Sequence, residues 1–202
     1  EMGFAHHLAM VYGDYVDQNV VNAMVDRGVM ALTGTSSSAQ AWQALIPNYS
    51  PGKAIAIKVN FNNCRSCSTT SLAIDALIHP INAVVYGLLQ AYADFRPADV
   101  WGYDASGLGD FPPRQIPTRF TRGCLYPEVR FMDYSCTEAA GYASADPSGL
   151  VKWTNPSDIP APPATRVTDV LVDAAYLINM PIMKPYHRSG VTLSFKNHFG
   201  SI

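Results

Sequence analysis

The sequence predicts an α/β fold in which a mostly parallel sheet is flanked by helices. Three patterns carry this prediction: a strand over residues 53–60, an apolar helix that begins at His79, and a second strand over residues 98–103. Strand, helix and strand in this order form a βαβ unit, whose two strands run parallel. We therefore expect a Rossmann-like βαβ core. Fifteen prolines and fourteen glycines in 202 residues add long Pro/Gly-rich loops to it.

The strand over residues 53–60 alternates branched and small side chains. Ile55, Ile57 and Val59 share one face, and the opposite face carries alanines before it ends at Lys58. Small alanines allow the strand to be buried on both faces. Lys58 therefore lies near the carboxyl end of a buried strand, where its ammonium group either reaches solvent or points at a ligand.

Helices are predicted before and between the two strands. Val20, Met24 and Leu32 have helical spacing, and Ser38 is expected to cap a second short helix that ends at Pro47. Pro80 occupies the first position of the central helix. The apolar stripe of that helix consists of Ile81, Val84, Val85, Leu88, Leu89 and Tyr92.

Shorter elements follow in the second half of the chain. We expect one or two helical turns over residues 118–125 and strands over residues 129–133, 166–172 and 176–180. Residues 134–165 contain a Pro-rich run and are expected to form an irregular excursion.

These elements predict a single α/β domain over residues 1–202, as a fragment of a longer chain. Residues 1–47 are its helical N-terminal segment, and residues 53–202 are its sheet core.

Composition excludes several functional classes. A net charge of −2 provides no basic surface for nucleic acid, and no apolar run reaches the roughly 18 to 20 residues of a membrane helix. The chain contains no Gly-x-Gly-x-x-Gly, Walker or Gly-x-Ser-x-Gly motif, which argues against a nucleotide dehydrogenase, a P-loop kinase and a serine hydrolase. Low Lys content with abundant Ser, Thr, Asn, Tyr and Pro fits an exported protein, periplasmic or extracellular, with a cytoplasmic location as the alternative.

Four cysteines leave several chemistries open. Cys64 and Cys67 form a Cys-x-x-Cys pair, which can hold zinc or an iron–sulfur cluster or act as a redox pair. Cys124 and Cys136 are too far apart to form a second tight pair, so disulfides or plain thiols are the commoner outcome of such spacing.

The closing segment concentrates polar side chains. Lys184, Arg188 and Lys196 lie within thirteen positions, although only 14 of the 202 residues are Lys or Arg. Polar loops that follow strands are the usual ligand sites of α/β proteins. The last motif fits either a strand or, preferably, a helix that ends at Gly200, and in both cases Thr192 and Lys196 are expected to share a face.

These observations predict an anion- or cofactor-binding site at the carboxyl edge of the sheet, where Asp104 follows the second strand and lies beside Lys58. Clustered ammonium groups repel one another unless an anion or a carboxylate lies between them. The alternative is a structural network in which the lysines pair with Asp75, Asp104, Asp169 or Asp173. The ligand-binding candidates are Lys58, Asn60, Asn62, Asp104, Lys184, His187, Thr192 and Asn197. Lys196 and His198 are the candidates for acid–base catalysis, and Cys64 and Cys67 are the candidate metal ligands.

Several stretches resemble the domain of unknown function 362 family. They are ALTGTSSSAQAWQALIPNYSPG, AIAIKVNFN, HPINAVVYGLL, VWGYDAS, YLINMPIMK and GVTLSFKNHFG, in order over residues 28–202. The resemblance implies an α/β fold with a site. It also implies an export signal of the twin-arginine type in many relatives, iron–sulfur proteins among some, and a C-terminal continuation that this chain lacks. Lys184 to His187 is one residue longer than the Lys-x-His usual in the family.

Three functions remain open at this point, and whether the protein is an enzyme is undecided. The first is an exported protein with a small anionic ligand or cofactor at the sheet edge. The second is a redox or metal protein that uses the Cys-x-x-Cys pair. The third is a non-catalytic binding or structural module that contacts a protein partner in an extracytoplasmic assembly.

Overall fold

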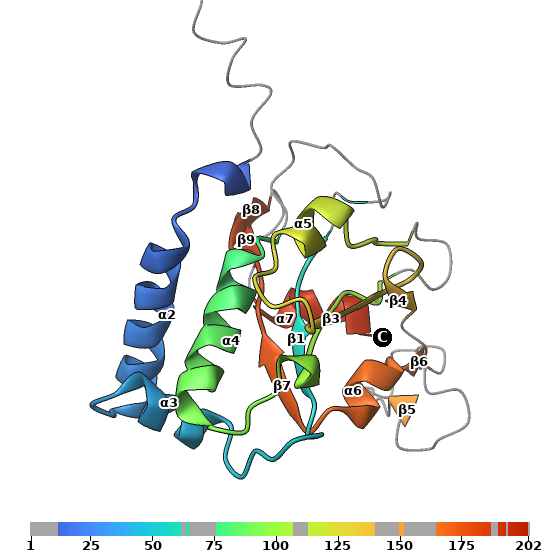
Figure 1. The fold of residues 1–202 in the computed structure, drawn as a ribbon. Helices are drawn as coiled ribbons and strands as arrows, with labels where there is room; N and C mark the ends of the chain where they lie inside the picture. The colour runs from blue at the N-terminus through green and yellow to red at the C-terminus, as the bar shows by residue number, and fades with distance from the viewer. Residues whose placement is uncertain are drawn as a thin grey trace, which may run out of the picture.

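A parallel sheet of five strands lies at the centre of the fold (Figure 1). The computed structural model describes residues 12–61, 64, 76–106, 113–139, 150–151, 165–186, 190–192 and 194–201. The strands of the sheet are β1 (Ile55–Lys58), β2 (Val100–Tyr103), β3 (Arg130–Asp133), β4 (Glu138–Ala139) and β7 (Tyr176–Asn179). Their spatial order is β4-β3-β2-β1-β7, and all neighbouring pairs are parallel. The predicted α/β class with a Rossmann-like parallel core is confirmed.

The remaining elements are helices and two small hairpins. The α-helices are α2 (Gln18–Thr33), α3 (Ser38–Leu45), α4 (His79–Ala91), α5 (Thr118–Arg122), α6 (Asp169–Asp173) and α7 (Ser194–Asn197). The 3₁₀ helices are η1 (Tyr12–Tyr15), η2 (Pro97–Asp99) and η4 (His198–Ser201). The antiparallel pairs are β5 (Leu150–Val151) with β6 (Thr165–Arg166), and β8 (Lys184–Tyr186) with β9 (Gly190–Thr192). Within the described part of the chain, no helix has the length and apolar character needed to cross a membrane.

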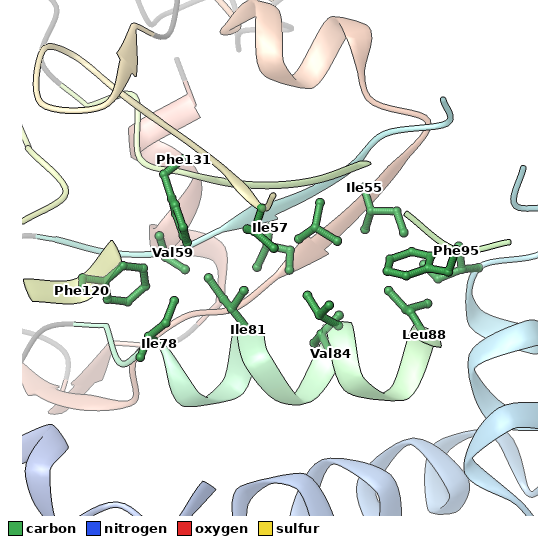
Figure 2. Close-up of a cluster of buried hydrophobic side chains, with 14 of the residues drawn as sticks. Ile55, Ile57, Val59, Ile78, Ile81, Val84, Leu88, Phe95, Phe120 and Phe131 are labelled. Carbon is green, nitrogen blue, oxygen red and sulfur yellow. The ribbon is translucent and has the colours of Figure 1, made fainter. Parts of the chain in front are cut away.

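The main core lies between α4 and one face of the sheet. Ile81, Val84 and Leu88 of α4 pack against Ile55 and Ile57 of β1, as Figure 2 shows. All five side chains are buried, because the helix turns its apolar stripe toward the branched face of the strand. Burial of each such side chain contributes about 1.5–3 kcal/mol. The predicted strand–helix–strand unit therefore forms as expected.

Helix α6 covers the opposite face of the sheet (Figure 1). Its Val170 is buried in a second apolar cluster with Ala56, Tyr103 and Met132. The strand predicted over residues 166–172 is wrong, because residues 169–173 form this helix. The valines there suggested a period of two, but a helical turn lets Val170 reach the sheet.

Helix α2 packs on α3 and α4 as an outer layer instead of on the sheet (Figure 1). The face expected to be buried is the wrong one: Val20, Met24 and Leu32 are 54, 66 and 74% exposed. The partly buried Val25 and Val29 face the core instead. A helix in an outer layer has little core to cover, so its apolar spacing does not define the buried face.

Two caps hold the N-terminal helices. The carboxylate of Asp17 accepts the N–H of Asn19 at the start of α2. Ser37, and not Ser38, caps α3 by accepting the N–H of Gln40. The hydroxyl of Ser38 donates instead to the carboxylate of Asp26 in α2, so it joins the two helices.

The strand order creates a topological switch point. From β1 the chain passes through α4 on one face to β2, and later returns through α6 on the other face to β7. Strands β2 and β7 therefore lie on opposite sides of β1. In open α/β sheets, ligands bind outside the carboxyl ends of two such strands.

Candidate functional site

Polar residues lie in one row at the carboxyl edge of the sheet. Asn179 is the last residue of β7, Lys58 the last of β1 and Tyr103 the last of β2, and the strand register places them side by side. Asp104 follows Tyr103 directly. The predicted proximity of Asp104 to the carboxyl end of β1 is confirmed.

Lys58 is completely buried in this row. Its Nζ donates to the carbonyl of Val59 and lies 3.2 Å from Oδ1 of Asp104. The same Nζ is 5.7 Å from the ring centroid of Tyr103, within the range of a cation–π contact. Burial lowers the pKa of the Lys58 ammonium group, and the attraction of the Asp104 carboxylate opposes that shift. Among the described residues, the ammonium group is therefore held by one carboxylate and one carbonyl.

The Asp104 carboxylate also organises the loops around it. Its Oδ2 accepts the N–H of Phe61 at 2.9 Å, and its Oδ1 accepts the hydroxyl of Ser106 at 2.6 Å. Both carboxylate oxygens thus have donors other than Lys58. Asp104 connects the segment after β1 to the segment after β2, and it would keep these contacts without an ammonium group beside it.

Asn197 of α7 lies over the gap between β1 and β7. Its Nδ2 donates to the carbonyl of Lys58 at 2.9 Å and to Oδ1 of Asn179 at 2.8 Å. In turn Asn179 donates from Nδ2 to the carbonyl of Ser194. Asn197 is 2% exposed, and its Oδ1 has no hydrogen-bond partner among the described residues. A buried acceptor of this kind needs a donor from a ligand or from water.

The last helical turn, η4, contacts the same edge through two side chains. The hydroxyls of Ser201 and Tyr103 are 2.9 Å apart, and Nδ1 of His198 is 3.3 Å from the Ser201 hydroxyl. The carbonyl of Ser201 accepts the N–H of Thr168 beside α6. Burial lowers the pKa of the His198 imidazole, and the nearby charge of Lys58 lowers it further.

The segment before α5 contacts the loops at this edge through Arg114 and Gln115. The N–H of Arg114 donates to the carbonyl of Ser106, and the N–H of Gln115 donates to the carbonyl of Cys64. The Nη1 atom of Arg114 is buried and lacks a hydrogen-bond partner in the part of the chain that the structure describes. The backbone of Arg114 thus contacts Ser106, whose hydroxyl donates to Asp104.

The structure brings together four of the predicted site residues: Lys58, Asp104, Asn197 and His198. The predicted candidate Asn60 follows β1, and its carbonyl accepts the N–H of Ala76.

The other candidates are placed less completely. Lys184 and Thr192 pair across the β8–β9 hairpin, and Lys196 lies in α7. The assumption of one continuous element behind the shared face of Thr192 and Lys196 is wrong, because Thr192 ends β9 and Lys196 lies in α7. The shared face itself stays a prediction. Asn62, Cys67 and His187 lie outside the described residues.

The candidate metal pair is only half described. Cys64 is a buried thiol outside any disulfide, and its N–H donates to the carbonyl of Phe61. Cys136 is disulfide-bonded. Within the described ranges, no three His, Cys, Asp or Glu side chains are grouped so as to hold a metal ion.

Several residues of the site were not expected from the sequence. They are Tyr103, Ser106, Arg114, Asn179 and Ser201. The rule that selected Lys58 and Asp104, a polar residue at the carboxyl end of a buried strand, would also have selected Asn179. For Tyr103 and Ser201 there is no such signal, because their contact joins residues 98 positions apart.

Comparison of the chain with family models, with curated protein sequences and with solved structures found no match.

Proposed function

We propose that the carboxyl edge at β1 and β7 binds a small anionic ligand, a phosphate or a carboxylate. The observation that carries the proposal is the buried polar pair at the switch point. Lys58 is 0% exposed and Asn197 is 2% exposed. They occupy the position where open α/β sheets bind their ligands.

Cationic donors favour an anion over a neutral ligand. A lysine ammonium has three N–H groups. Those of Lys58 serve the Val59 carbonyl and the Asp104 carboxylate among the described residues, which leaves one N–H for a ligand. The buried Nη1 of Arg114 is a further N–H donor whose charge suits an oxyanion. A phosphate or carboxylate supplies the acceptor oxygens that such donors require.

The Oδ1 atom of Asn197 narrows the ligand class. It is a buried acceptor with no partner in the described part of the chain. A ligand that carries an O–H beside its anionic oxygens would satisfy it. Hydrogen phosphate and a hydroxycarboxylate both have this arrangement. Sulfate does not, because it is fully deprotonated and carries no O–H group.

The alternative is that Lys58 and Asp104 form a structural ion pair only. Two features favour a ligand. A buried ion pair adds little stability over apolar residues of the same volume. In addition, Asp104 already accepts from Phe61 and Ser106, so Lys58 is not needed to satisfy it. Perturbed, buried ionisable groups at a sheet edge are typical of functional sites.

Inorganic phosphate is the first probe of this site. We expect it to raise the free energy of unfolding by RT ln(1 + [L]/Kd), or about 2.7 kcal/mol at a hundred times Kd. Sodium sulfate of equal ionic strength should have a smaller effect, because it lacks the O–H group and shares only the general salt effect. The measurement is urea unfolding followed at several phosphate concentrations.

Two variants separate the site from the surface. Lys58→Met with Asp104→Asn removes both buried charges together and should abolish the phosphate effect. Lys53→Met removes an exposed lysine just before the start of β1, and the Nζ of this lysine donates to the Asn48 carbonyl. This variant should leave the stabilisation by phosphate unchanged. Equal phosphate stabilisation in the double variant and in the wild type would refute binding at this edge.

We also propose catalytic residues and a family for the protein, and two further experiments test the alternative functions. Lys196 and His198 are the candidates for acid–base chemistry on the bound anion, and membership of the domain of unknown function 362 family is the proposed kinship. Phosphate binding with no reaction on phosphate esters would favour the binding-module alternative. A metal that co-purifies with the protein and is lost in Cys64→Ser would favour the metal alternative.

We further propose that the protein is exported. The disulfide at Cys136 supports this, because disulfides persist in oxidising compartments. Protein isolated without reductant is expected to have two titratable thiols among its four cysteines under denaturing conditions, since Cys64 and Cys124 are thiols. Thiol titration before and after reduction measures this. Four thiols in protein isolated from an oxidising compartment would contradict the disulfide and remove its support for export.

A further inference from the structure

A hydrogen-bonded chain of three side chains connects the second strand to the candidate site. The Tyr103 hydroxyl lies 2.9 Å from the Ser201 hydroxyl, and the Ser201 hydroxyl lies 3.3 Å from Nδ1 of His198. Tyr103 and Ser201 are 0 and 1% exposed, whereas His198 is half-buried. The imidazole is therefore the member of the chain that can meet a ligand.

The direction of these hydrogen bonds follows from counting protons. Burial raises the pKa of the Tyr103 phenol, so it keeps its proton, and Ser201 is its hydrogen-bond partner among the described residues. If Tyr103 and His198 both donated to Ser201, the buried serine proton would have no acceptor in that set. If the serine donated to Tyr103, the phenolic proton would have none. Only donation from Tyr103 to Ser201 and from Ser201 to Nδ1 of His198 uses both protons.

The charge state of His198 is consistent with this direction. Burial and the charge of Lys58 both lower the pKa of the imidazole, so the ring is neutral near pH 7. A neutral imidazole has one ring proton. Because Nδ1 accepts from Ser201, that proton must lie on Nε2.

We propose that His198 presents a fixed Nε2–H donor to an oxygen of the bound anion, with Tyr103 and Ser201 as positioning residues that select this tautomer. The ligand half of this inference rests on the proposed function; the tautomer half does not. In this tautomer Nε2 of His198 is a hydrogen-bond donor, so of the two roles proposed for His198, acid or base, this nitrogen does not serve as the base. A neutral donor adds to Lys58 and Arg114 without adding a third positive charge to the site.

The tautomer is tested without any ligand. In protein labelled with ¹⁵N at histidine, the His198 ring should show a protonated Nε2 and an unprotonated Nδ1, with a titration midpoint below the usual value of about 6.5. Ser201→Ala removes the donor to Nδ1 and should raise that midpoint and mix the two tautomers. Tyr103→Phe should act in the same direction but less. A protonated Nδ1 in the wild type, or an unchanged His198 titration in Ser201→Ala, would overturn the tautomer assignment.

The donor role is tested with inorganic phosphate. Phosphate should shift the Nε2–H resonance of His198. His198→Ala should weaken phosphate binding at least about tenfold, as expected for a hydrogen bond to a charged group. His198→Gln places an amide N–H near the Nε2 position and should restore most of the affinity. Circular dichroism of each variant confirms that it is folded.

The outcomes distinguish this inference from the proposed function. If the wild type does not bind phosphate, the proposed function fails and so does the ligand half here, while the tautomer result stands by itself. If the wild type binds phosphate and His198→Ala binds equally well, the proposed function survives and the donor role of His198 is refuted.

Discussion

Replacing Asp104 with asparagine is expected to lower the free energy of unfolding by about 3–5 kcal/mol. The substitution keeps the size of the side chain but removes the carboxylate that faces the buried ammonium group of Lys58. A buried charge that loses its ion-pair partner retains the full cost of leaving water. Urea unfolding of Asp104→Asn against wild type measures the loss.

Adding Lys58→Met to the Asp104→Asn variant should rescue its stability. The double variant has no buried charge in this pair, so we expect it to recover most of the stability, to within about 1–2 kcal/mol of wild type. The coupling between the two substitutions is the quantity of interest. A double variant whose loss equals the sum of the two single losses would show that the charges do not interact as their 3.2 Å separation implies.

The loss in Asp104→Asn should also depend on pH. Burial lowers the pKa of Lys58 in the folded protein, and the substitution removes the carboxylate that opposed this shift. The unfolded chain, with a lysine pKa of about 10.4, then binds more protons than the folded chain between the two pKa values. Stability therefore rises with pH across that window as the folded lysine loses its proton. Wild type should show a weaker rise.

Replacing Gly87 with alanine is expected to destabilise the protein by about 1–3 kcal/mol. A Cβ at this position of α4 would lie 2.0 Å from Nε1 and 2.7 Å from Cδ1 of Trp42. Trp42 of α3 is 3% exposed and cannot move aside without disturbing the contact between α3 and α4. Thermal or urea unfolding reports the effect.

Gly28 provides the control, since it lies inside α2 with nothing within 4 Å of an added Cβ. Gly28→Ala should stabilise the protein by about 0.5–1 kcal/mol, because alanine loses less backbone entropy in a helix than glycine does. Trp42→Phe combined with Gly87→Ala should regain part of the loss by removing the ring edge. Equal shifts for the two glycine variants would contradict the close approach of Trp42.

The central βαβ unit was predictable because local pattern and tertiary packing agree there. The alternation from Ile55 to Val59 and the apolar stripe of α4 are both read directly from the sequence, and both face the core. Leu89 is the exception: it was predicted in the stripe and is 37% exposed. The same agreement fails at α2, where Val20 and Met24 have the right spacing but face solvent. A helix that packs on other helices can bury any of several faces, and local periodicity does not select one.

Some contacts of the candidate site were likewise predictable from the sequence, and others were not. Lys58 and Asp104 were predictable together, because parallel strands bring their carboxyl ends to one edge and both residues follow from strand boundaries. The contact of Ser201 with Tyr103 was not predictable, because it depends on how the closing segment folds back over the sheet. The assumption that Thr192 and Lys196 belong to one element was wrong, because the motif changes from strand to helix within five residues.

By itself the sequence determined the α/β class, the parallel βαβ core and the polar carboxyl ends of its strands, since these follow from periodicity and chain topology. Only the tertiary structure decided the return of β7 to the other side of β1, which creates the switch point. It also decided that Asn197 spans Lys58 and Asn179, and that Ser201 orients His198. The Ser201–His198 contact is local to η4, but Ser201 also contacts Tyr103, 98 positions away. The contacts of Asn197 join separate elements, one of them across 139 positions, and their free energy comes from burial and hydrogen bonding that no local window of sequence contains.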